Sequence, residues 1–369
     1  MEFDFSEVLT RMVAERASDV HLTAGRPPSV RVRGRLSPLE DYPRLTPQDT
    51  RDVVYSVLNS DQRKRFENEL QLDFAYMIPG VARFRVNVFF QRGSISAAFR
   101  HVPEQIGSLE GLGLPAVLSE FTRKPRGFVL ITGPTGSGKS TTLASMLDMI
   151  NQEREEHILT IEDPIEFLHR HQKCIVNQRE IGADAVDFPT ALKAALREDP
   201  DVILVGEMRD LETISTAITA AETGHLVFAT LHTQSTAQTV DRIIDVFPPH
   251  QQQQVRMQLS IALEGIVTQQ LLPTADGSGR VPATEVLVPT PAVRNLIREG
   301  KTHQIYSVLQ TSAASGMQTM DSHLAQLVRS GAITREIAER RASVPEEIKR
   351  LLGAAGGPQA APMPRVAAV

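Results

Sequence analysis

The sequence has little of what a disulfide-stapled, zinc-bound or membrane-spanning fold requires. Its 369 residues include one cysteine, Cys174, and no tryptophan. One thiol cannot form an intramolecular disulfide or a zinc site built from two or four thiolates. No run approaches the roughly 18 apolar residues of a membrane-spanning helix, and the opening MEFDFSEVL has acids where a secretory signal has basic residues. We therefore expect a cytoplasmic protein that does not insert directly into a membrane.

The charge balance and the shortage of aromatic residues argue against a nucleic-acid-binding protein. The chain has 39 Lys and Arg against 44 Asp and Glu, a formal net charge of −5. Its 14 Phe and 4 Tyr provide few platforms on which bases could stack. A local basic groove is still compatible with this composition. We predict no nucleic-acid partner.

The length predicts two domains, and the first of them, over 1–105, has the pattern of a small α+β unit. Residues 5–13 and 53–70 have helical spacing, and residues 30–35 have the alternation of a hairpin strand. Residues 82–89 alternate cleanly, which places Arg83 and Arg85 on one face of a strand and Phe84 and Val86 on the other. One face is expected to be buried and the other cationic.

The second domain, over 121–353, has the pattern of an α/β fold. Glycines and prolines between 103 and 115 interrupt any periodicity, which predicts a linker over 106–120. Apolar runs then alternate with helical segments, which favours a parallel sheet covered on both faces. These runs are 128–132, 157–161, 202–205 and 226–231. Beyond 235 the pattern is largely helical, with one strand-like run at 281–288, and 354–369 is expected to be a disordered tail.

A glycine-rich loop between a predicted strand and a predicted helix has the pattern GxxxxGK[ST]. It runs Gly133-Pro134-Thr135-Gly136-Ser137-Gly138-Lys139-Ser140, and Thr141 follows in the helix. Glycines let the backbone curl so that successive N–H groups face nucleotide phosphates, and the helix N-terminus adds its positive dipole end. Lys139 can reach the β- and γ-phosphates, and the Ser140 hydroxyl can bind Mg²⁺. The alternative is a chance match, against which the flanking strand and helix argue.

Two acidic segments can complete a site for nucleotide hydrolysis, which needs groups that hold Mg²⁺ and position water. The first, IEDPIE over 161–166, ends a predicted strand. The second is a buried strand followed by Gly206 and Glu207, one residue later than the acid of the commoner Walker B pattern. Spacing alone leaves open which acid organises Mg²⁺ and which polarises water. Either segment, taken alone, could equally be solvated loop acids.

Two histidines bracket the predicted strand over 226–231. His225 precedes this strand and His232 follows it. They are roughly 23 Å apart along an extended chain and cannot share a metal ion. His232, at the carboxyl end, is placed to sense a γ-phosphate or to pass its presence to the next helix. A hydrogen-bonded structural role is the alternative for both histidines.

Four segments resemble, in order and spacing, the Walker A, Asp-box, Walker B and His-box motifs of the secretion and type IV pilus ATPases. They are GPTGSGKSTT, TIEDPIEF, DPDVILVGEMRDLET and TAAETGHLVFATLHT, and all four lie within 133–233. The resemblance also includes SDVHLTAG, near the start of the chain. The resemblance implies a RecA-like P-loop ATPase core preceded by a smaller α+β, PAS-like N-terminal domain. It also implies a ring of six chains, with ATP clamped between the two domains.

The resemblance further implies roles for individual residues. Glu166, the second glutamate of the Asp-box, is implied as the catalytic base for water, and Glu207 as the support for Mg²⁺. Arg85 and Arg100 are the best matches to the arginines that complete the site from the N-terminal domain, and Arg83 and Arg92 remain alternatives. Such arginines would stabilise charge on the transferred phosphoryl group. An exposed basic strand face is the other interpretation of this region.

The retraction branch of the family fits the sequence best. Extension-type and secretion-type relatives carry a longer N-terminal region and usually a four-cysteine zinc element, which one cysteine cannot provide. Residues 291–299, PAVRNLIRE, resemble an element of the pilus retraction ATPases. The resemblance therefore implies a hexameric, Mg²⁺-dependent ATPase that drives type IV pilus retraction and twitching motility. It would act at the inner membrane through a platform protein, with a paralogous retraction ATPase as a further candidate partner.

Three alternatives remain open at this stage. The chain could be the accessory paralogue of a retraction ATPase, which shares most of these motifs. It could be a subunit that binds ATP without hydrolysing it, although Lys139, Glu166 and Glu207 are all present. A nucleic-acid motor on the same RecA-like core is the third, and the acidic net charge argues against it.

Overall fold

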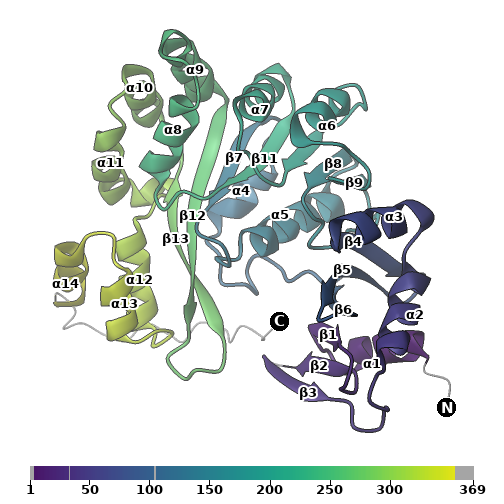
Figure 1. Cartoon of the computed structure of the whole chain (residues 1–369). Helices are drawn as coiled ribbons and strands as arrows, with labels where there is room; N and C mark the ends of the chain where they lie inside the picture. The colour runs from purple at the N-terminus through teal and green to yellow at the C-terminus, as the bar shows by residue number, and fades with distance from the viewer. Residues whose placement is uncertain (1–3, 33, 104, 354–369) are drawn as a thin grey trace. The chain divides into compact units, whose positions relative to one another are not determined.

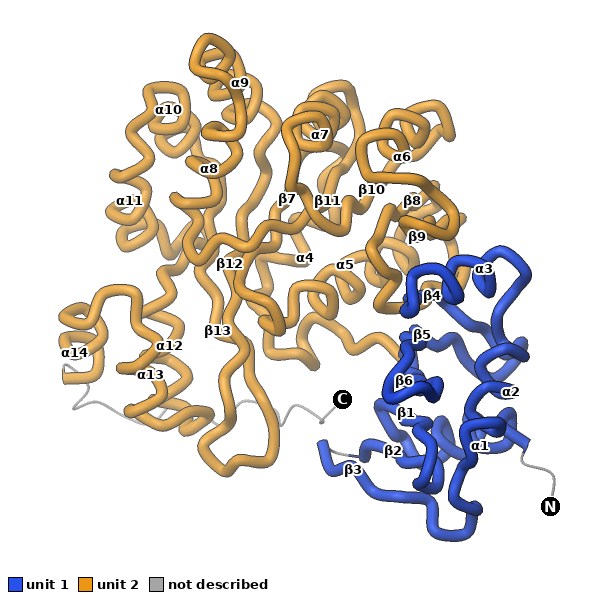
Figure 2. Tube along the Cα trace, viewed as in Figure 1, with its two compact units in different colours: residues 1–104 blue, residues 105–369 orange. Residues whose placement is uncertain are grey.

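The structure is a computed structural model, and it describes residues 4–32, 34–103 and 105–353. The chain divides into two compact units, residues 1–104 and 105–369, coloured blue and orange in Figure 2. Each unit has a hydrophobic core of its own and is described by itself. The tail over 354–369, for which we expect disorder, lies outside the described residues.

An antiparallel sheet of six strands, in the order β3-β2-β1-β6-β5-β4, forms the first unit together with three helices (Figure 1). The helices are α1 (Phe5–Ala14), α2 (Pro47–Val57) and α3 (Ser60–Glu69), and the strands are β1 (Asp19–Leu22), β2 (Ser29–Val32), β3 (Arg35–Pro38), β4 (Gln71–Ile78), β5 (Ala82–Gln91) and β6 (Ser94–Val102). Strand β5 buries Phe84 and Val86 and exposes Arg85. The alternation predicted for this strand is therefore confirmed.

The single helical stretch predicted over 53–70 is wrong, because the structure has two helices there. Helix α2 ends at Val57 and α3 begins at Ser60. The side chain of Asn59 accepts hydrogen bonds from the backbone N–H groups of Asp61 and Gln62, at 3.1 and 2.9 Å. Asparagine is a strong N-cap residue, so its side chain starts a new helix at the point where the periodic pattern suggests none.

A sheet of seven strands, in the order β13-β12-β7-β11-β10-β8-β9, forms the centre of the second unit. Only β12 and β13 pair antiparallel; the other neighbours pair parallel. The strands are β7 (Gly127–Thr132), β8 (His157–Glu162), β9 (Ile175–Glu180), β10 (Val202–Val205), β11 (Leu226–Leu231), β12 (Leu263–Pro273) and β13 (Arg280–Leu287). The five strands predicted from apolar runs are all confirmed.

Helices cover both faces of this sheet, because the central strands are apolar on both sides. Leu130 of β7 packs in one core cluster with Ile218 of helix α7, and its neighbour Ile131 packs in another with Leu143 of α5. The helices are α4 (Val117–Thr122), α5 (Lys139–Glu153), α6 (Phe188–Ala195), α7 (Leu211–Thr223), α8 (Thr236–Asp245), α9 (Pro249–Ala262), α10 (Pro291–Glu299), α11 (Ile305–Thr311), α12 (Met320–Arg329), α13 (Arg335–Arg341) and α14 (Pro345–Gly353). Within the residues described, no helix is long and apolar enough to cross a membrane.

Two strands of the second unit were not predicted. Strand β12 begins at Leu263, directly after α9 ends at Ala262, so no glycine or proline separates the helical pattern from the strand. Strand β9 has the sequence IVNQRE and lies at the edge of the sheet, with Ile175 exposed. A short polar edge strand lacks the apolar run that identifies a central strand.

The segment expected as a linker contributes to the core of the second unit. Leu109, Leu114 and Leu118 are buried there, together with Phe121 of helix α4. The Oγ of Ser145, on helix α5, donates a hydrogen bond to the carbonyl of Gly107. The segment 106–120 is therefore anchored to the second unit by apolar side chains.

Buried His323, on helix α12, couples the stability of the second unit to pH. Its Nδ1 accepts a hydrogen bond from the backbone N–H of Thr284 at 2.9 Å, and burial lowers its pKa from 6.5 to about 4. As the pH falls from 7 to 5, the unfolded chain binds a proton at this imidazole and the folded chain does not. The free energy of unfolding should therefore fall by about 2 kcal/mol from this group.

The variant His323→Asn should lose about 2 kcal/mol less stability than the wild type between pH 7 and pH 5. Asparagine places an oxygen near the position of Nδ1, so it can still accept from Thr284, but it does not titrate. Urea unfolding at the two pH values measures the difference. Glu285 and Asp321, whose pKa values burial raises, are present in both proteins and cancel in the comparison. Equal losses would contradict the prediction.

Candidate active site

The glycine-rich loop joins the carboxyl end of β7 to the start of helix α5. Gly133 and Gly138 have φ angles of 140° and 89°, which residues with a side chain rarely adopt. Gly138 is the N-cap of α5 and has no side chain with which to cap it. The N–H groups of the first helical turn are therefore available to an anion. The tip of the loop, residues 134–136, is exposed.

Lys139 lies across the loop and is electrostatically linked to two carboxylates. Its Nζ donates hydrogen bonds to the carbonyls of Gly133 and Pro134, at 2.8 and 3.1 Å. Burial lowers the pKa of Lys139, and the charges of Glu207 and Glu166 oppose this shift. The structure thus brings the predicted lysine and the two predicted glutamates into one electrostatic environment.

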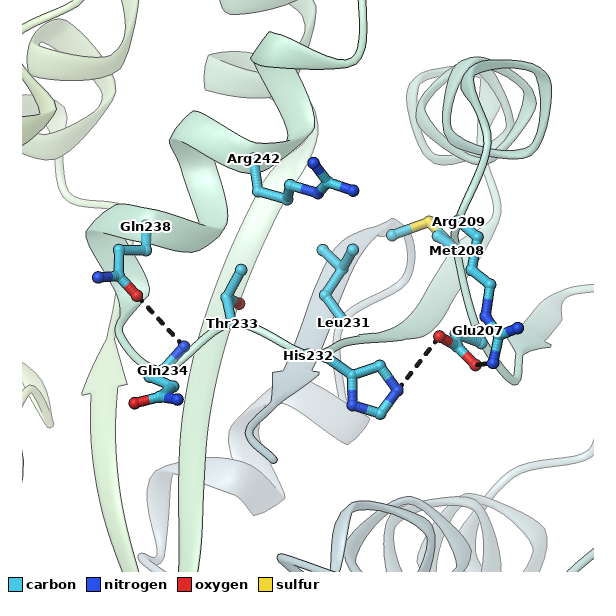
Figure 3. A pocket seen from close by; sticks show the side chains of 9 residues that line it. All are labelled: Glu207, Met208, Arg209, Leu231, His232, Thr233, Gln234, Gln238 and Arg242. Carbon is cyan, nitrogen blue, oxygen red and sulfur yellow. Dashed lines mark hydrogen bonds and ion pairs between the residues drawn. The ribbon is translucent and has the colours of Figure 1, made fainter. Parts of the chain in front are cut away.

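Two neighbouring side chains hold Glu207, which follows strand β10 after Gly206 (Figure 3). Its Oε2 accepts a hydrogen bond from Arg209 Nη2 at 2.7 Å, and its Oε1 lies 3.1 Å from His232 Nε2. The hydrogen bond from Arg209 lowers the pKa of Glu207, whereas its partial burial acts in the opposite direction. Glu207 is therefore ionised at neutral pH, with one partner on each oxygen.

The Asp-box turn separates a half-buried glutamate, Glu162, from an exposed one, Glu166. Glu162 accepts hydrogen bonds from Thr160 Oγ1 at 2.6 Å and Gln178 Nε2 at 3.1 Å, and burial raises its pKa. The N–H of buried Ile165 donates to Glu180 Oε2 at 3.1 Å, which anchors the turn. Glu166, the next residue, is exposed. Of the two glutamates in this motif, Glu166 is the one that solvent can reach freely.

The structure separates the two predicted histidines. His232 follows β11 and reaches Glu207, as its position at the carboxyl end predicts. His225 lies at the other end of β11, where its Nδ1 is 3.0 Å from the carbonyl of Ala220 and its own carbonyl accepts from Gly127 N. Gly127 begins β7, so His225 is roughly 20 Å along the strand from the phosphate loop. The structure therefore does not bring His225 into the site, and its contacts are those of a structural residue.

Arg85 and Arg100 belong to the first unit, whereas the residues above belong to the second. They are direct cross-strand partners on β5 and β6, and both are exposed. The Nε of Arg100 lies 2.8 Å from Oδ1 of Asp19, and this pairing contributes to lowering the pKa of Asp19 against its burial. As cross-strand partners, Arg85 and Arg100 lie on the same face of the sheet, and the exposure of Arg85 agrees with the alternation predicted for β5.

Arg209 was missed by the sequence interpretation. With Glu207 and His232 it lines a cavity at the carboxyl ends of β10 and β11 (Figure 3). The other residues that line it are Met208, Leu231, Thr233, Gln234, Gln238 and Arg242. The sequence feature that could have identified Arg209 is its position two residues after Glu207, in GEMRDLET. At that spacing the arginine side chain can reach the glutamate.

The donor groups at this edge of the sheet fit Mg²⁺ bound together with a nucleotide. Protein sites for Mg²⁺ usually offer one or two oxygen ligands and leave the rest to water and substrate phosphates. The Ser140 hydroxyl, in the first turn of α5, and the Glu207 carboxylate are oxygen donors of the kind that such a site would use. Among the described residues, no group of three His, Cys, Asp or Glu side chains converges as an all-protein metal cage would require.

Known proteins resemble this chain over most of its length. Residues 83–340 match the family described as type II/IV secretion system protein. The type IV pilus retractation ATPase PilT of Pseudomonas aeruginosa is 52% identical over 343 residues, which cover 93% of this chain and 99% of that protein. The type IV pilus ATPase PilU of the same organism is 44% identical over 349 residues, covering 95% and 91%.

A solved structure resembles this chain in fold as well as in sequence. The crystal structure of the pilus retraction motor PilT with bound ADP has a TM-score of 0.89 to this structure, at 52% identity, and covers 95% of this chain and 100% of that one. The expected fold class, an α/β RecA-like ATPase core with a smaller α+β N-terminal domain, is confirmed. The chain belongs to the type II/IV secretion system protein family, the family of secretion and type IV pilus ATPases.

Proposed function

We propose that the protein is a Mg²⁺-dependent ATPase motor that hydrolyses ATP to drive the retraction of type IV pili. The observation that carries this proposal is the electrostatic meeting of Lys139, Glu166 and Glu207 beside an uncapped helix N-terminus. That arrangement lies in a chain with 52% identity, over nearly its whole length, to a P. aeruginosa protein named as a pilus retraction ATPase.

ATP is held through its phosphates by residues 133–141. The backbone N–H groups of the loop and of the first turn of α5 donate to the phosphate oxygens. The Nζ of Lys139 already donates to two loop carbonyls, so its ammonium is directed back toward the start of the loop. Binding exchanges these carbonyls for the β- and γ-phosphates, which carry full negative charge.

Hydrolysis requires a base for water and a neutralising environment for the γ-phosphate. The water oxygen attacks the γ-phosphorus, the bond to the bridging oxygen of ADP breaks, and the proton of the water passes to the exposed Glu166 carboxylate. Ser140 and Glu207 would hold Mg²⁺, and a bound Mg²⁺ would offset charge on the phosphate oxygens. His232, in contact with Glu207, reports the state of this carboxylate to the start of helix α8.

The paired arginines of the first unit, Arg85 and Arg100, complete the site in this proposal. Guanidinium groups stabilise charge that develops on a transferred phosphoryl group, and they sense its loss after hydrolysis. The linked change in domain arrangement would then provide the mechanical step. Six chains form the working ring, which acts on the cytoplasmic side of the inner membrane through a pilus platform protein and with a PilU-like paralogue.

An accessory role like that of PilU is the second candidate, because PilU of P. aeruginosa is 44% identical over 95% of this chain. The higher identity to PilT of that organism, 52%, favours the main retraction motor. A nucleic-acid motor is the weakest candidate, since the chain has a net charge of −5 and few aromatic residues.

Deleting the gene separates pilus retraction from pilus assembly. Cells without the protein should keep surface pili and lose twitching motility, as seen by electron microscopy and by spreading on agar. Complementation with the wild-type gene should restore twitching, and complementation with a Lys139→Ala variant should not. Loss of the pili themselves would assign the protein to assembly. Normal twitching in the deletion strain would contradict the proposal of a main motor.

A further inference from the structure

Strand β12 extends past the end of β7 and runs alongside the phosphate loop. The two strands pair in parallel up to Thr268 and Thr132, and Thr132 is the last residue of β7. The hydroxyls of these two threonines are 2.8 Å apart, which fixes the register at this point. Because β12 continues to Pro273, Gln269 is the first residue of β12 to lie beside the loop itself.

The side chain of Gln269 is buried and connects the loop to helix α5. It is 2% exposed, its Nε2 donates to the carbonyl of Ser137 at 2.7 Å, and its Oε1 accepts from Thr142 Oγ1 at 2.8 Å. Both ends of the amide are thus used in buried hydrogen bonds, which are costly to break because the groups left behind lose water as well as their partner. The amide ties the last turn of the loop to the first turn of the helix.

Two glycines of the loop are packed against Gln269. A Cβ atom at Gly133 would lie 2.2 Å from the carbonyl oxygen of Gln269, and one at Gly138 would lie 2.8 Å from its Nε2. Both distances are too short for real carbon atoms to occupy. Gly133 is therefore required by contact with the backbone of Gln269 as well as by its positive φ angle, and a side chain at Gly138 would have to displace the hydrogen-bonded amide of Gln269.

We propose that Gln269 is a positioning residue for nucleotide binding, an inference that rests on the proposed function of the loop. The carbonyl of Ser137 and the N–H of Gly138 belong to one planar trans peptide and point in opposite directions. When Gln269 holds the carbonyl on the β12 side, the N–H of Gly138 is directed to the other side, where the phosphates bind. The glutamine thus orients a phosphate donor without touching the phosphate.

The variant Gln269→Met tests this, because methionine removes both hydrogen bonds at nearly constant volume. The Kd for MgADP, measured by calorimetry on the full chain, should rise about tenfold through loss of the two buried hydrogen bonds. Gln270→Met is the matched control, since the adjacent side chain on a strand points to the opposite face. It should leave the Kd within twofold of the wild type. Thermal unfolding of each variant shows whether the fold is retained.

A second variant keeps the test decisive if Gln269→Met does not fold. Thr142→Val removes one of the two partners of the amide and should weaken MgADP binding in the same direction by a smaller factor. In the folded case, adding Thr142→Val to Gln269→Met should have little further effect, because both act through the same contact.

The possible outcomes separate this inference from the proposed function. Unchanged affinity in a folded Gln269→Met, or in Thr142→Val where Gln269→Met is unfolded, overturns the positioning role. An equal loss in Gln270→Met overturns it as well, because the effect is then not specific to this side chain. A wild-type protein that binds no MgADP overturns the proposed function of the loop instead.

Discussion

Replacing Lys139 by alanine should abolish ATP hydrolysis and weaken nucleotide binding by at least a hundredfold. The ammonium is half-buried, and burial lowers its pKa against the opposing effect of Glu207 and Glu166. A charge that is partly desolvated in the free protein gains strongly when it meets phosphate oxygens, since the interaction occurs away from bulk water. Removing one preorganised donor to developing charge commonly costs 10² to 10³ in rate. Phosphate release and calorimetric titration with MgATP measure the two effects.

Lys193→Ala is the matched control for this variant. Lys193 is an exposed lysine of helix α6, and its Nζ pairs with Glu212 on the surface of the second unit. The same substitution there removes a charge without touching the loop and should leave turnover unchanged. Lys139→Arg separates charge from shape, because a guanidinium retains the charge but cannot fit both loop carbonyls in the same way. Full turnover in Lys139→Ala would contradict the assignment of the site.

The strands at the centre of the second unit were predictable because both of their faces are buried. Leu130 and Ile131 are neighbours that pack in different core clusters. Because consecutive residues on both faces are buried, the sequence of the strand is an unbroken apolar run. Strand β12 was not predictable in the same way. It follows α9 without a break and carries Gln269, a buried amide whose partners are distant in sequence. A polar residue of this kind lowers the strand signal, although it makes two buried hydrogen bonds in the fold.

The candidate site was predictable where it is local in sequence and not where it depends on tertiary contacts. Residues 133–140 form one continuous loop, so their spacing carries the whole pattern. The cluster of Arg209, Glu207 and His232 joins the ends of two neighbouring strands, and no spacing rule links residues 25 positions apart. His232 could be distinguished from His225 in the sequence, because His232 follows its strand at the carboxyl end, where ligands bind, and His225 precedes it.

Replacing Glu166 by glutamine should lower kcat by about 10² to 10⁴ and leave MgADP affinity within threefold of the wild type. The range is the usual contribution of a general base, and the amide is nearly isosteric but cannot accept the proton of the attacking water. Glu166 is exposed, and its charge influences the pKa of Lys139. It therefore lies near the loop, and its side chain is not part of the buried core. Single-turnover hydrolysis and calorimetry separate the chemical step from binding. Glu155→Gln, an exposed glutamate before strand β8, is the control and should be fully active.

The same measurements on Glu207→Gln decide between the two acids that spacing alone could not distinguish. Glu207 already engages Arg209 and His232 through its two oxygens, and its pKa is lowered, so it is suited to remain a charged ligand rather than to take up a proton. The Mg²⁺ concentration for half-maximal activity should therefore rise in Glu207→Gln and stay unchanged in Glu166→Gln. If the two variants exchange these behaviours, the roles of base and metal support are reversed. If both change the Mg²⁺ requirement equally, the carboxylates act as one coupled unit, because each then alters the field in which the other binds its proton or its ion.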